Sequence, residues 1–272
     1  MTLSELKVAI IGASGRMGAQ LIELMLDRDD VTLVAAVTHA ESSALGQDVG
    51  SRLHRPTAGV QFSHDLMAAA KAADVLVDFS LPAALADNLA AAVQTQTPIV
   101  VCTTGLNSRQ HADVEAAAAK VPVLYAANTS LGVNLLLALV RTASQALGSN
   151  CDIEILEAHH TAKRDAPSGT ALALGEAAAA GRGQQLKDVA EYQRNHQHDP
   201  YKKGSIGFAT LRAGDIVGEH TVYLVCGSER LELTHRVAGR KTFAEGALNA
   251  ALWLAKQTPG FYHMKHVLGL DD

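Results

Sequence analysis

Residues 8–18 decide the fold, and they read Val8-Ala9-Ile10-Ile11-Gly12-Ala13-Ser14-Gly15-Arg16-Met17-Gly18. A short β-branched run leads into a glycine turn, and the residues after the turn are typical of the start of a helix. Glycines let the backbone N–H groups of such a turn approach a pyrophosphate, and the helix N-terminus provides a favourable field for the anion. The spacing is G-x-x-G-x-x-G instead of the commoner G-x-G-x-x-G. Its place after the first strand nevertheless favours dinucleotide binding over an ordinary strand-to-helix turn.

The same alternation of strand and helix continues through the first half of the chain. Short apolar runs that suit buried strands lie at 8–11, 31–37, 75–77, 99–101 and 121–125. Candidate helices lie between them at 17–26, 83–94 and 109–119. Alternating units of this kind predict a Rossmann-like, doubly wound parallel sheet, which binds ligands beyond the carboxyl ends of its strands.

The pattern changes after about residue 130. Helices are expected at 134–147 and 169–180, and strands with alternating polarity at 151–157, 206–212, 220–226 and 231–237. Segment 181–203 is polar and is interpreted as a loop, residues 227–230 as a hairpin turn, and residues 243–254 as a helix that returns to the first domain. We therefore expect an α/β protein with a dinucleotide-binding domain of residues 1–130 and 241–272. Residues 131–240 would form a second, α+β domain with an open mixed sheet.

The composition excludes several classes of protein. Of the 272 residues, 48% are hydrophobic and 19% charged, which is ordinary globular usage. A net charge of −5 with 4% aromatic residues argues against a nucleic-acid partner. No uninterrupted apolar run approaches the roughly 18 residues that cross a bilayer, and the N-terminus lacks the pattern of a secretion signal. The cysteines, Cys102, Cys151 and Cys226, are far apart, so we expect reduced thiols, no metal centre and a cytoplasmic protein.

The choice between NADH and NADPH depends on the end of the second predicted strand. An acid that holds the ribose 2′-hydroxyl is expected there. The chain has Thr38 and then His39, with Glu41 slightly later. Arg16, in the glycine turn, could pair with a 2′-phosphate, although a solvated charge at the helix start is the alternative. Because no acid at position 38 would repel that phosphate, NADPH is expected to be tolerated.

A second group of polar residues lies at 157–170: Glu157-Ala158-His159-His160-Thr161-Ala162-Lys163-Arg164-Asp165-Ala166-Pro167-Ser168-Gly169-Thr170. The free N–H groups of the helix start and the hydroxyls of Ser168 and Thr170 would bind a carboxylate. Histidine and lysine nearby supply a proton source, so the segment predicts an anionic-substrate pocket with acid chemistry. The alternatives are a metal-site fragment, a solvated Lys163-Arg164 pair, and a simple helix cap at Ser168.

Five segments together resemble the dihydrodipicolinate reductase (4-hydroxy-tetrahydrodipicolinate reductase) family: 12–18, 102–105, 126–130, 157–170 and 214–220. The similarity runs nearly end to end, and the string E-A-H-H-x-x-K-x-D-A-P-S-G-T is highly specific. The resemblance implies NADPH- or NADH-dependent reduction of 4-hydroxy-tetrahydrodipicolinate to tetrahydrodipicolinate, with loss of water, in lysine and diaminopimelate biosynthesis. It also implies a substrate bound between the two domains and a homotetramer built through the sheet of the second domain.

The resemblance assigns His159 as the acid/base residue and Lys163 as the proton donor. Contacts to the substrate carboxylates are expected from His160, Ser168, Gly169, Thr170 and Arg240. The cofactor residues, from the resemblance and from the predicted strand ends, are Gly12, Ala13, Ser14, Gly15, Arg16, Met17, Thr38, His39, Phe79, Cys102, Thr103, Thr104, Ala126, Ala127, Asn128 and Thr129. The chain departs from the family where Thr38-His39 replaces a frequent Glu-Arg, and where Cys102 replaces a frequent glycine.

Two other functions remain open at the level of the sequence. A nucleotide-sensing module without turnover would share the glycine turn, but it has no need of the polar segment 157–170. A different NAD(P)-dependent enzyme, such as an acylating aldehyde dehydrogenase, would need a cysteine nucleophile. Cys102 is the one cysteine near the expected cofactor face, and a small packed residue is the better interpretation of it.

Overall fold

The computed structural model describes residues 5–194 and 200–270 of the chain. The chain divides into two compact units, residues 1–130 with 240–272 and residues 131–239. The first unit is built on a parallel sheet and the second on a mixed sheet. These two sheets confirm the predicted fold class.

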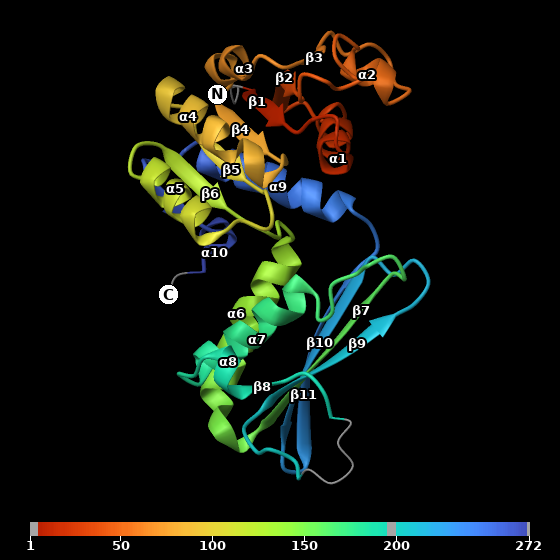
Figure 1. Ribbon diagram of the computed structural model, residues 1–272, viewed down its shortest axis with the longest axis vertical. Coiled ribbons are helices and arrows are strands. Elements are labelled where there is room, and N and C mark those ends of the chain that lie inside the picture. The colour runs from red at the N-terminus through yellow and green to blue at the C-terminus, as the bar shows by residue number, and fades with distance from the viewer. Residues whose placement is uncertain (1–4, 195–199, 271–272) are drawn as a thin grey trace. The chain divides into compact units, whose positions relative to one another are not determined.

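The first unit contains a seven-stranded sheet in the order β12-β6-β5-β4-β1-β2-β3, and the strand pairs are parallel. Its strands are β1 (Leu6–Ile11), β2 (Val31–Val37), β3 (Phe62–Ser63), β4 (Val75–Asp78), β5 (Ile99–Val101), β6 (Pro122–Tyr125) and β12 (Gly260–Tyr262). Read from β3, the order 3-2-1-4-5-6 is that of the dinucleotide-binding fold, with β12 added at the β6 edge. Figure 1 shows β1, β4, β5 and β6 side by side.

Helices cover the sheet because its strands are apolar on both faces. They are α1 (Arg16–Met25), α2 (Val49–Arg52), α3 (Leu66–Ala72), α4 (Leu85–Thr95), α5 (Ser108–Ala118), α9 (Lys241–Leu254) and α10 (Met264–Val267). On one face, Ala9 and Leu76 pack against Leu89 of α4 and Val114 of α5. Successive residues of a strand point to opposite faces, so the equally buried Ile10 serves the other face. The sequence did not predict β3, β12, α2, α3 or α10, which are short.

The second unit contains a five-stranded mixed sheet in the order β11-β10-β7-β9-β8. Its strands are β7 (Asp152–His159), β8 (Ala190–Glu191), β9 (Ile206–Arg212), β10 (Gly218–Cys226) and β11 (Glu229–Val237), and its helices are α6 (Leu131–Leu147), α7 (Gly169–Gly181) and α8 (Leu186–Val189). The expectation of a loop over 181–203 is wrong for α8 and β8. Leu186 of α8 is buried in the core of this unit, and β8 pairs with β9 as an edge strand.

One face of this sheet packs against α6 and α7, which run along it in Figure 1. Ile153 and Ile155 of β7 contact Leu174 of α7 and Leu136 of α6 in a single core. By length and composition alone, residues 131–150 would suffice to cross a membrane, with a mean hydropathy of 1.3. Leu136 and Val140, on one side of α6, belong to the hydrophobic core of the second unit, whereas Leu135 and Leu139 are exposed.

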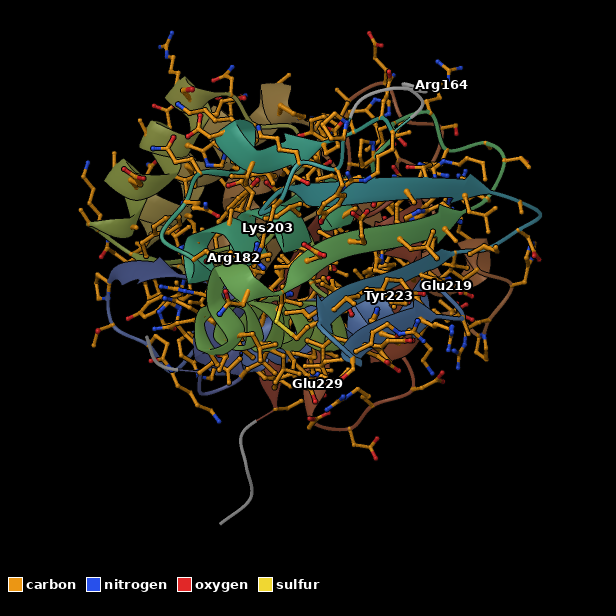
Figure 2. All side chains as sticks on the ribbon, turned by 90° about the horizontal axis from the view of Figure 1, so that it is seen from below. Arg164, Arg182, Lys203, Glu219, Tyr223 and Glu229 are labelled. Carbon is orange, nitrogen blue, oxygen red and sulfur yellow. A yellow bond between two sulfur atoms is a disulfide. The ribbon has the colours of Figure 1, made fainter. Side chains whose placement is uncertain are left out.

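The expectation of three reduced thiols is wrong for two of the cysteines. Cys151 and Cys226 form a disulfide, which Figure 2 shows as a yellow bond. The two cysteines are 75 residues apart in sequence. Asp152 of β7 pairs with Val225 of β10, however, and this register makes Cys151, just before Asp152, a neighbour of Cys226, just after Val225. Their Cα–Cα distance is 4.3 Å. The separation along the chain conceals this register. Cys102 is a free, buried thiol.

Candidate active site

The carboxyl ends of five neighbouring strands share one edge of the parallel sheet. The strands are β1, β2, β4, β5 and β6. The residues that follow them are Gly12–Met17, Thr38 and His39, Phe79, Cys102–Thr104 and Ala126–Thr129. The structure therefore brings the predicted cofactor residues to the same edge.

The glycine turn after β1 can pack closely against the end of β4 and the start of α1 only because of its glycines. Gly12 has a φ of +77°, and a Cβ there would lie 2.6 Å from the carbonyl oxygen of Phe79. A Cβ at Gly18 would lie 2.5 Å from the carbonyl oxygen of Gly12. Helix α1 begins after Gly15, which supplies no side-chain cap. An uncapped helix N-terminus beside a tight glycine turn fits the pyrophosphate of a dinucleotide.

The end of β2 is tied to this turn by a short hydrogen bond. The hydroxyl groups of Ser14 and Thr38 are 2.5 Å apart, and Thr38 is buried. His39, the next residue, is exposed. Position 38 thus holds a neutral hydroxyl that is already hydrogen-bonded, where an acid would bind the ribose of NADH.

A buried carboxylate organises the ends of β4 and β5. Asp78 is fully buried, accepts a 2.8 Å hydrogen bond from the N–H of Ser80, and lies 3.3 Å from the Thr103 hydroxyl. Burial raises the pKa of Asp78. Burial, with the nearby Asp78, also raises the pKa of Cys102 well above its usual range, so this thiol is a poor nucleophile. The alternative of an acylating aldehyde dehydrogenase is therefore disfavoured, because Cys102 was its candidate nucleophile.

The loop after β6 is anchored to α9 within the same unit. Ala126 donates a 3.0 Å backbone hydrogen bond to Val101, and the Thr129 hydroxyl donates a 2.6 Å hydrogen bond to the carbonyl of Phe243. Thr129 is buried. The backbone of 126–129, and not the Thr129 hydroxyl, is therefore the part of this loop that can face a ligand.

In the second unit, three adjacent strands change from apolar to polar at the same level. On the face that packs on the helices, Ile155 is followed by Glu157 in β7, Phe208 by Thr210 in β9, and Val222 is preceded by His220 in β10. The register pairs Glu157 with His220 on one side and with Thr210 on the other. Helix α7 begins at the same level. These polar residues therefore form a cluster where the hydrophobic core ends, at the end of β7 and the start of α7.

Glu157 is the centre of this cluster, and it is 1% exposed. Its carboxylate lies 2.6 Å from Nδ1 of His159 and accepts two 2.8 Å hydrogen bonds from the guanidinium of Arg212. It also accepts a 3.0 Å hydrogen bond from the N–H of Ser168, the residue that caps α7. One carboxylate therefore fixes the histidine ring, the end of β9 and the start of α7.

The charges in the cluster follow from burial and these contacts. Burial alone would raise the pKa of Glu157, but the hydrogen bonds from Arg212 and His159 hold it below its usual value. Burial lowers the pKa of His159, against the opposing effect of its bond to Glu157. His159 is therefore neutral near pH 7. Since Nδ1 is bonded to Glu157, Nε2 is the ring nitrogen that can exchange a proton, and a Cβ at Gly218 would lie 3.2 Å from it.

Ser168 serves as a helix cap, which is the alternative given for it above. The side chain is buried, its hydroxyl accepts a 3.2 Å hydrogen bond from the N–H of Ala171, and it lies 3.0 Å from Nε2 of His220. This hydroxyl therefore has two partners within the chain, and its expected contact with a substrate carboxylate stays a prediction. Burial lowers the pKa of His220 to about 4, so His220 is neutral. Gly169, the first residue of α7, is exposed.

The other predicted site residues of this segment lie on its exposed loop. The ammonium of Lys163 is 2.9 Å from the carboxylate of Asp165. His160 is half-buried, and Arg164, which is labelled in Figure 2, is exposed. Arg240 belongs to the first unit, where it immediately precedes α9. Among the residues that the structure describes, no group of three or more His, Cys, Asp or Glu side chains could hold a metal ion.

Sequence reasoning missed Arg212 and His220 as parts of the site. Each ends or begins a predicted strand, and neither stands in the 157–170 segment. Only the register shows their positions, since Arg212 pairs with His159 and His220 pairs with Glu157 across neighbouring strands. The sequence offered one indication of their role: Arg212 and His220 fall at positions that the alternating pattern assigns to the buried face of a strand.

Comparisons with known proteins agree along the whole chain. Residues 6–129 match the family model for the N-terminus of dihydrodipicolinate reductase, and residues 132–268 match the model for its C-terminus. The chain is 49% identical over 267 residues to a 4-hydroxy-tetrahydrodipicolinate reductase of Zymomonas mobilis subsp. mobilis, covering 98% of each chain. It is 49% identical over 264 residues to that of Alkalilimnicola ehrlichii, covering 97% of this chain and 99% of the relative.

A solved structure has the same fold. It is a dipicolinate-bound dihydrodipicolinate reductase from Paenisporosarcina sp. TG-14, which matches with a TM-score of 0.76 at 20% identity. The match covers 95% of this chain and 97% of the other.

Proposed function

The chain belongs to the dihydrodipicolinate reductase family, and from this premise we propose how its own residues carry out the reaction. The protein is an NAD(P)H-dependent oxidoreductase of lysine and diaminopimelate biosynthesis. It reduces 4-hydroxy-tetrahydrodipicolinate to tetrahydrodipicolinate with loss of water. The observation that carries the assignment of roles is the Glu157-centred cluster at the junction of β7 and α7, which joins a neutral histidine to a helix N-terminus.

The first unit holds the cofactor. NADH or NADPH, when bound, supplies the hydride. The N–H groups at the start of α1 would bind the pyrophosphate, and Gly12 and Gly18 allow the tight turn that presents these groups. Thr103 and the backbone of 126–129 line the nicotinamide side at the ends of β5 and β6. Asp78 holds the Thr103 hydroxyl in place.

The second unit holds the substrate, a cyclic imine with two carboxylates. One carboxylate binds the exposed N-terminus of α7 at Gly169 and Thr170, where the helix field favours an anion. His160, which is half-buried on the loop before α7, is the further carboxylate contact that this unit offers. The dicarboxylate class is supported by the dipicolinate bound to the relative from Paenisporosarcina.

The chemistry requires the hydroxyl at C4 to leave as water, hydride to add at C4, and a proton to add to the neighbouring carbon of the resulting enamine. Lys163 is the better donor of that proton, because His159 is neutral near pH 7. Neutral His159 offers a lone pair at Nε2 and so can accept a proton. Asp165 holds the Lys163 ammonium on the loop beside this histidine.

The experiment that tests the function follows NADPH, then NADH, by absorbance. The substrate is generated in situ from pyruvate and aspartate semialdehyde by the preceding synthase. We expect oxidation that requires the synthase. Protein that is folded and binds NADPH, yet oxidises neither cofactor in this assay, would contradict the assignment and favour a sensor or another substrate.

The open face of the second unit's sheet supports a homotetramer. On the face away from α6 and α7, Leu156 lies between Thr221 and Ala209 in the register, and Leu156 is 38% exposed. Leu211, on the same face, is 48% exposed. Figure 2 labels Tyr223 and Glu219 on β10, which alternate with the buried residues of that strand. A sheet face with exposed leucines is typical of one that a second copy covers.

Light scattering coupled to gel filtration tests the assembly. We expect a tetramer for the unmodified protein and a smaller species for Leu156→Glu. The matched control is Leu81→Glu, because Leu81 is a 73% exposed leucine of the first unit. A monomeric wild type, or a Leu156→Glu protein that stays tetrameric, would contradict this arrangement. For the enzyme as a whole we propose a cytoplasmic location, where NADPH is available.

A further inference from the structure

A cationic cavity lies in the first unit, beside the glycine turn. Its volume is about 640 Å³, and it opens between the start of α1 and the segment around α2. The polar side chains that line it are Ser14, Arg16, Gln47, Ser51, Arg52 and His54, and no lining residue is acidic. Two guanidinium groups and an imidazole in one cavity without a carboxylate favour an anionic ligand.

The two arginines of this cavity differ from other arginines of the unit. Arg55 pairs with Asp27, and Arg28 pairs with Asp30. Arg52 donates a 3.3 Å hydrogen bond to a neutral acceptor, Oε1 of Gln47. Among residues 5–194 and 200–270, neither Arg16 nor Arg52 has an acidic partner within ion-pair distance. Their charges are therefore available to a bound anion.

Asp48 is the acid nearest in sequence to the cavity lining, and it is occupied elsewhere. Its carboxylate accepts hydrogen bonds from the N–H groups of Ser51, Ala58 and Gly59, at 3.0, 3.0 and 2.8 Å. These bonds cap α2 and hold the following turn. The carboxylate is directed to the backbone and does not line the cavity.

His54 has an unusual backbone conformation, with a φ of +57°. This left-handed region is favoured by glycine and costs other residues free energy. Glycine would be the relaxed choice at the end of α2, yet the chain has a histidine there, and its side chain lines the cavity. A strained residue that contributes a polar group to a cavity supports a ligand-binding role.

The position of the cavity identifies the anion. Ser14 lines the cavity and is hydrogen-bonded to Thr38 at the end of β2, where the adenosine ribose of a dinucleotide lies in this fold. We propose that Arg52, together with Arg16 and His54, binds the 2′-phosphate of NADPH and so determines the preference for NADPH over NADH. This inference rests on the proposed cofactor site. It adds Arg52 and His54, which lie outside the glycine turn, to the residues that recognise the cofactor.

Direct binding measurements test the proposal. The dissociation constants of NADPH and NADH are measured by calorimetry for the unmodified protein, Arg52→Gln and Arg55→Gln. Loss of one charge-assisted contact to a phosphate predicts that Arg52→Gln weakens NADPH binding about tenfold and leaves NADH binding within about twofold. Arg55→Gln is the matched control, because Arg55 carries the same charge only three residues from Arg52. The guanidinium of Arg55, however, already pairs with Asp27. It should leave the ratio of the two constants unchanged.

A second variant does not depend on removing an arginine. His54→Gly relieves the left-handed backbone, so the fold is retained, and it should weaken NADPH binding more than NADH binding. Equal changes for the two cofactors in Arg52→Gln, or none, would overturn the proposal, as would a change of the same size in Arg55→Gln. Unmodified protein that binds neither cofactor would instead refute the proposed function, so the two failures are distinguishable.

Discussion

The carboxylate of Glu157 is the residue on which the geometry of the candidate site depends most. It contacts His159, Arg212 and the N–H of Ser168, three groups that belong to different elements. Among the residues that the structure describes, Glu157 is the acid that raises the pKa of His159, whereas Lys163 and Arg212 lower it. Glu157 therefore orients the ring and opposes the effect of burial on its pKa.

Glu157→Gln is expected to lower kcat by about tenfold or more, because the oriented ring is lost. Glu157 is the contact that raises the pKa of His159, so its removal lowers that pKa further. If neutral His159 is the active form, the acidic limb of the pH profile moves to lower pH. The measurement is kcat and kcat/KM from pH 5 to 9. Thr210→Val is the control, since it removes only a 3.3 Å neutral contact to the same carboxylate. A fall in kcat with an unmoved profile would show a merely structural role.

A second prediction at this scale concerns Gly12. Gly12→Ala should abolish measurable NADPH binding and lower Tm, because the new Cβ would meet the Phe79 carbonyl at 2.6 Å. The control Gly59→Ala separates the effect of a left-handed backbone from the effect of a steric clash of the new Cβ. Gly59 has nearly the same φ, +76°, but nothing lies within 4 Å of a Cβ there. The control should lose about 1 kcal/mol of stability and keep its NADPH affinity. Equal NADPH affinities for the two variants would refute the close-approach argument.

At the scale of single elements, strand β10 carries a pH-dependent contribution to stability. His220 has a folded-state pKa of about 4, against 6.5 for the ordinary side chain, because it is buried. The unfolded chain binds the extra proton between these values, so stability is full above pH 6.5 and is lost as the pH falls towards 4. Between pH 7 and pH 5 this loss is about 2 kcal/mol.

His220→Gln removes that titration and keeps a polar group beside Ser168. The fall in Tm between pH 7 and pH 5 should therefore be smaller in the variant than in the unmodified protein, by several degrees. His64→Gln, a change at an exposed histidine of the first unit, should leave the fall in Tm as it is. The same fall in Tm for His220→Gln and unmodified protein would contradict the burial argument.

The elements that sequence reasoning found are those with a long apolar pattern of their own. The predicted bounds 31–37 and 99–101 match those of β2 and β5, because their apolar runs rich in β-branched residues are typical of buried strands. The two-residue strands β3 and β8 were missed, since pairing with a neighbour defines them and local pattern does not. The disulfide and the contacts of Arg212 were missed for the same reason, as both depend on the register between strands far apart in sequence.

The candidate site shows the same division. His159 and Lys163 lie in a specific sequence string, so the sequence alone was enough to predict their roles. Ser168 was assigned to the substrate because a hydroxyl at a helix start can bind either a ligand or the helix itself. The structure shows this hydroxyl bonded to the helix N–H of Ala171 and beside the buried His220, and sequence alone does not show the second contact.

At the scale of the whole molecule, the proposed tasks are divided between the two units. The glycine turn and the ends of the parallel strands belong to residues 1–130, and the Glu157-centred cluster belongs to residues 131–239. Each unit has its own hydrophobic core, so a substitution in one cluster leaves the local structure of the other intact. The account therefore predicts that chemistry and cofactor binding can be damaged separately.

The most direct test of that claim is a comparison of kcat with the NADPH dissociation constant in Lys163→Ala. The account predicts that kcat falls about a hundredfold or more, the size of effect expected for loss of a positioned proton donor, while the dissociation constant changes less than about twofold. Lys187→Ala, at an exposed lysine of the same unit, serves as the control and should change neither quantity. Comparable losses in kcat and in NADPH affinity, or an unchanged kcat, would contradict the role of Lys163 and the division of tasks between the two units.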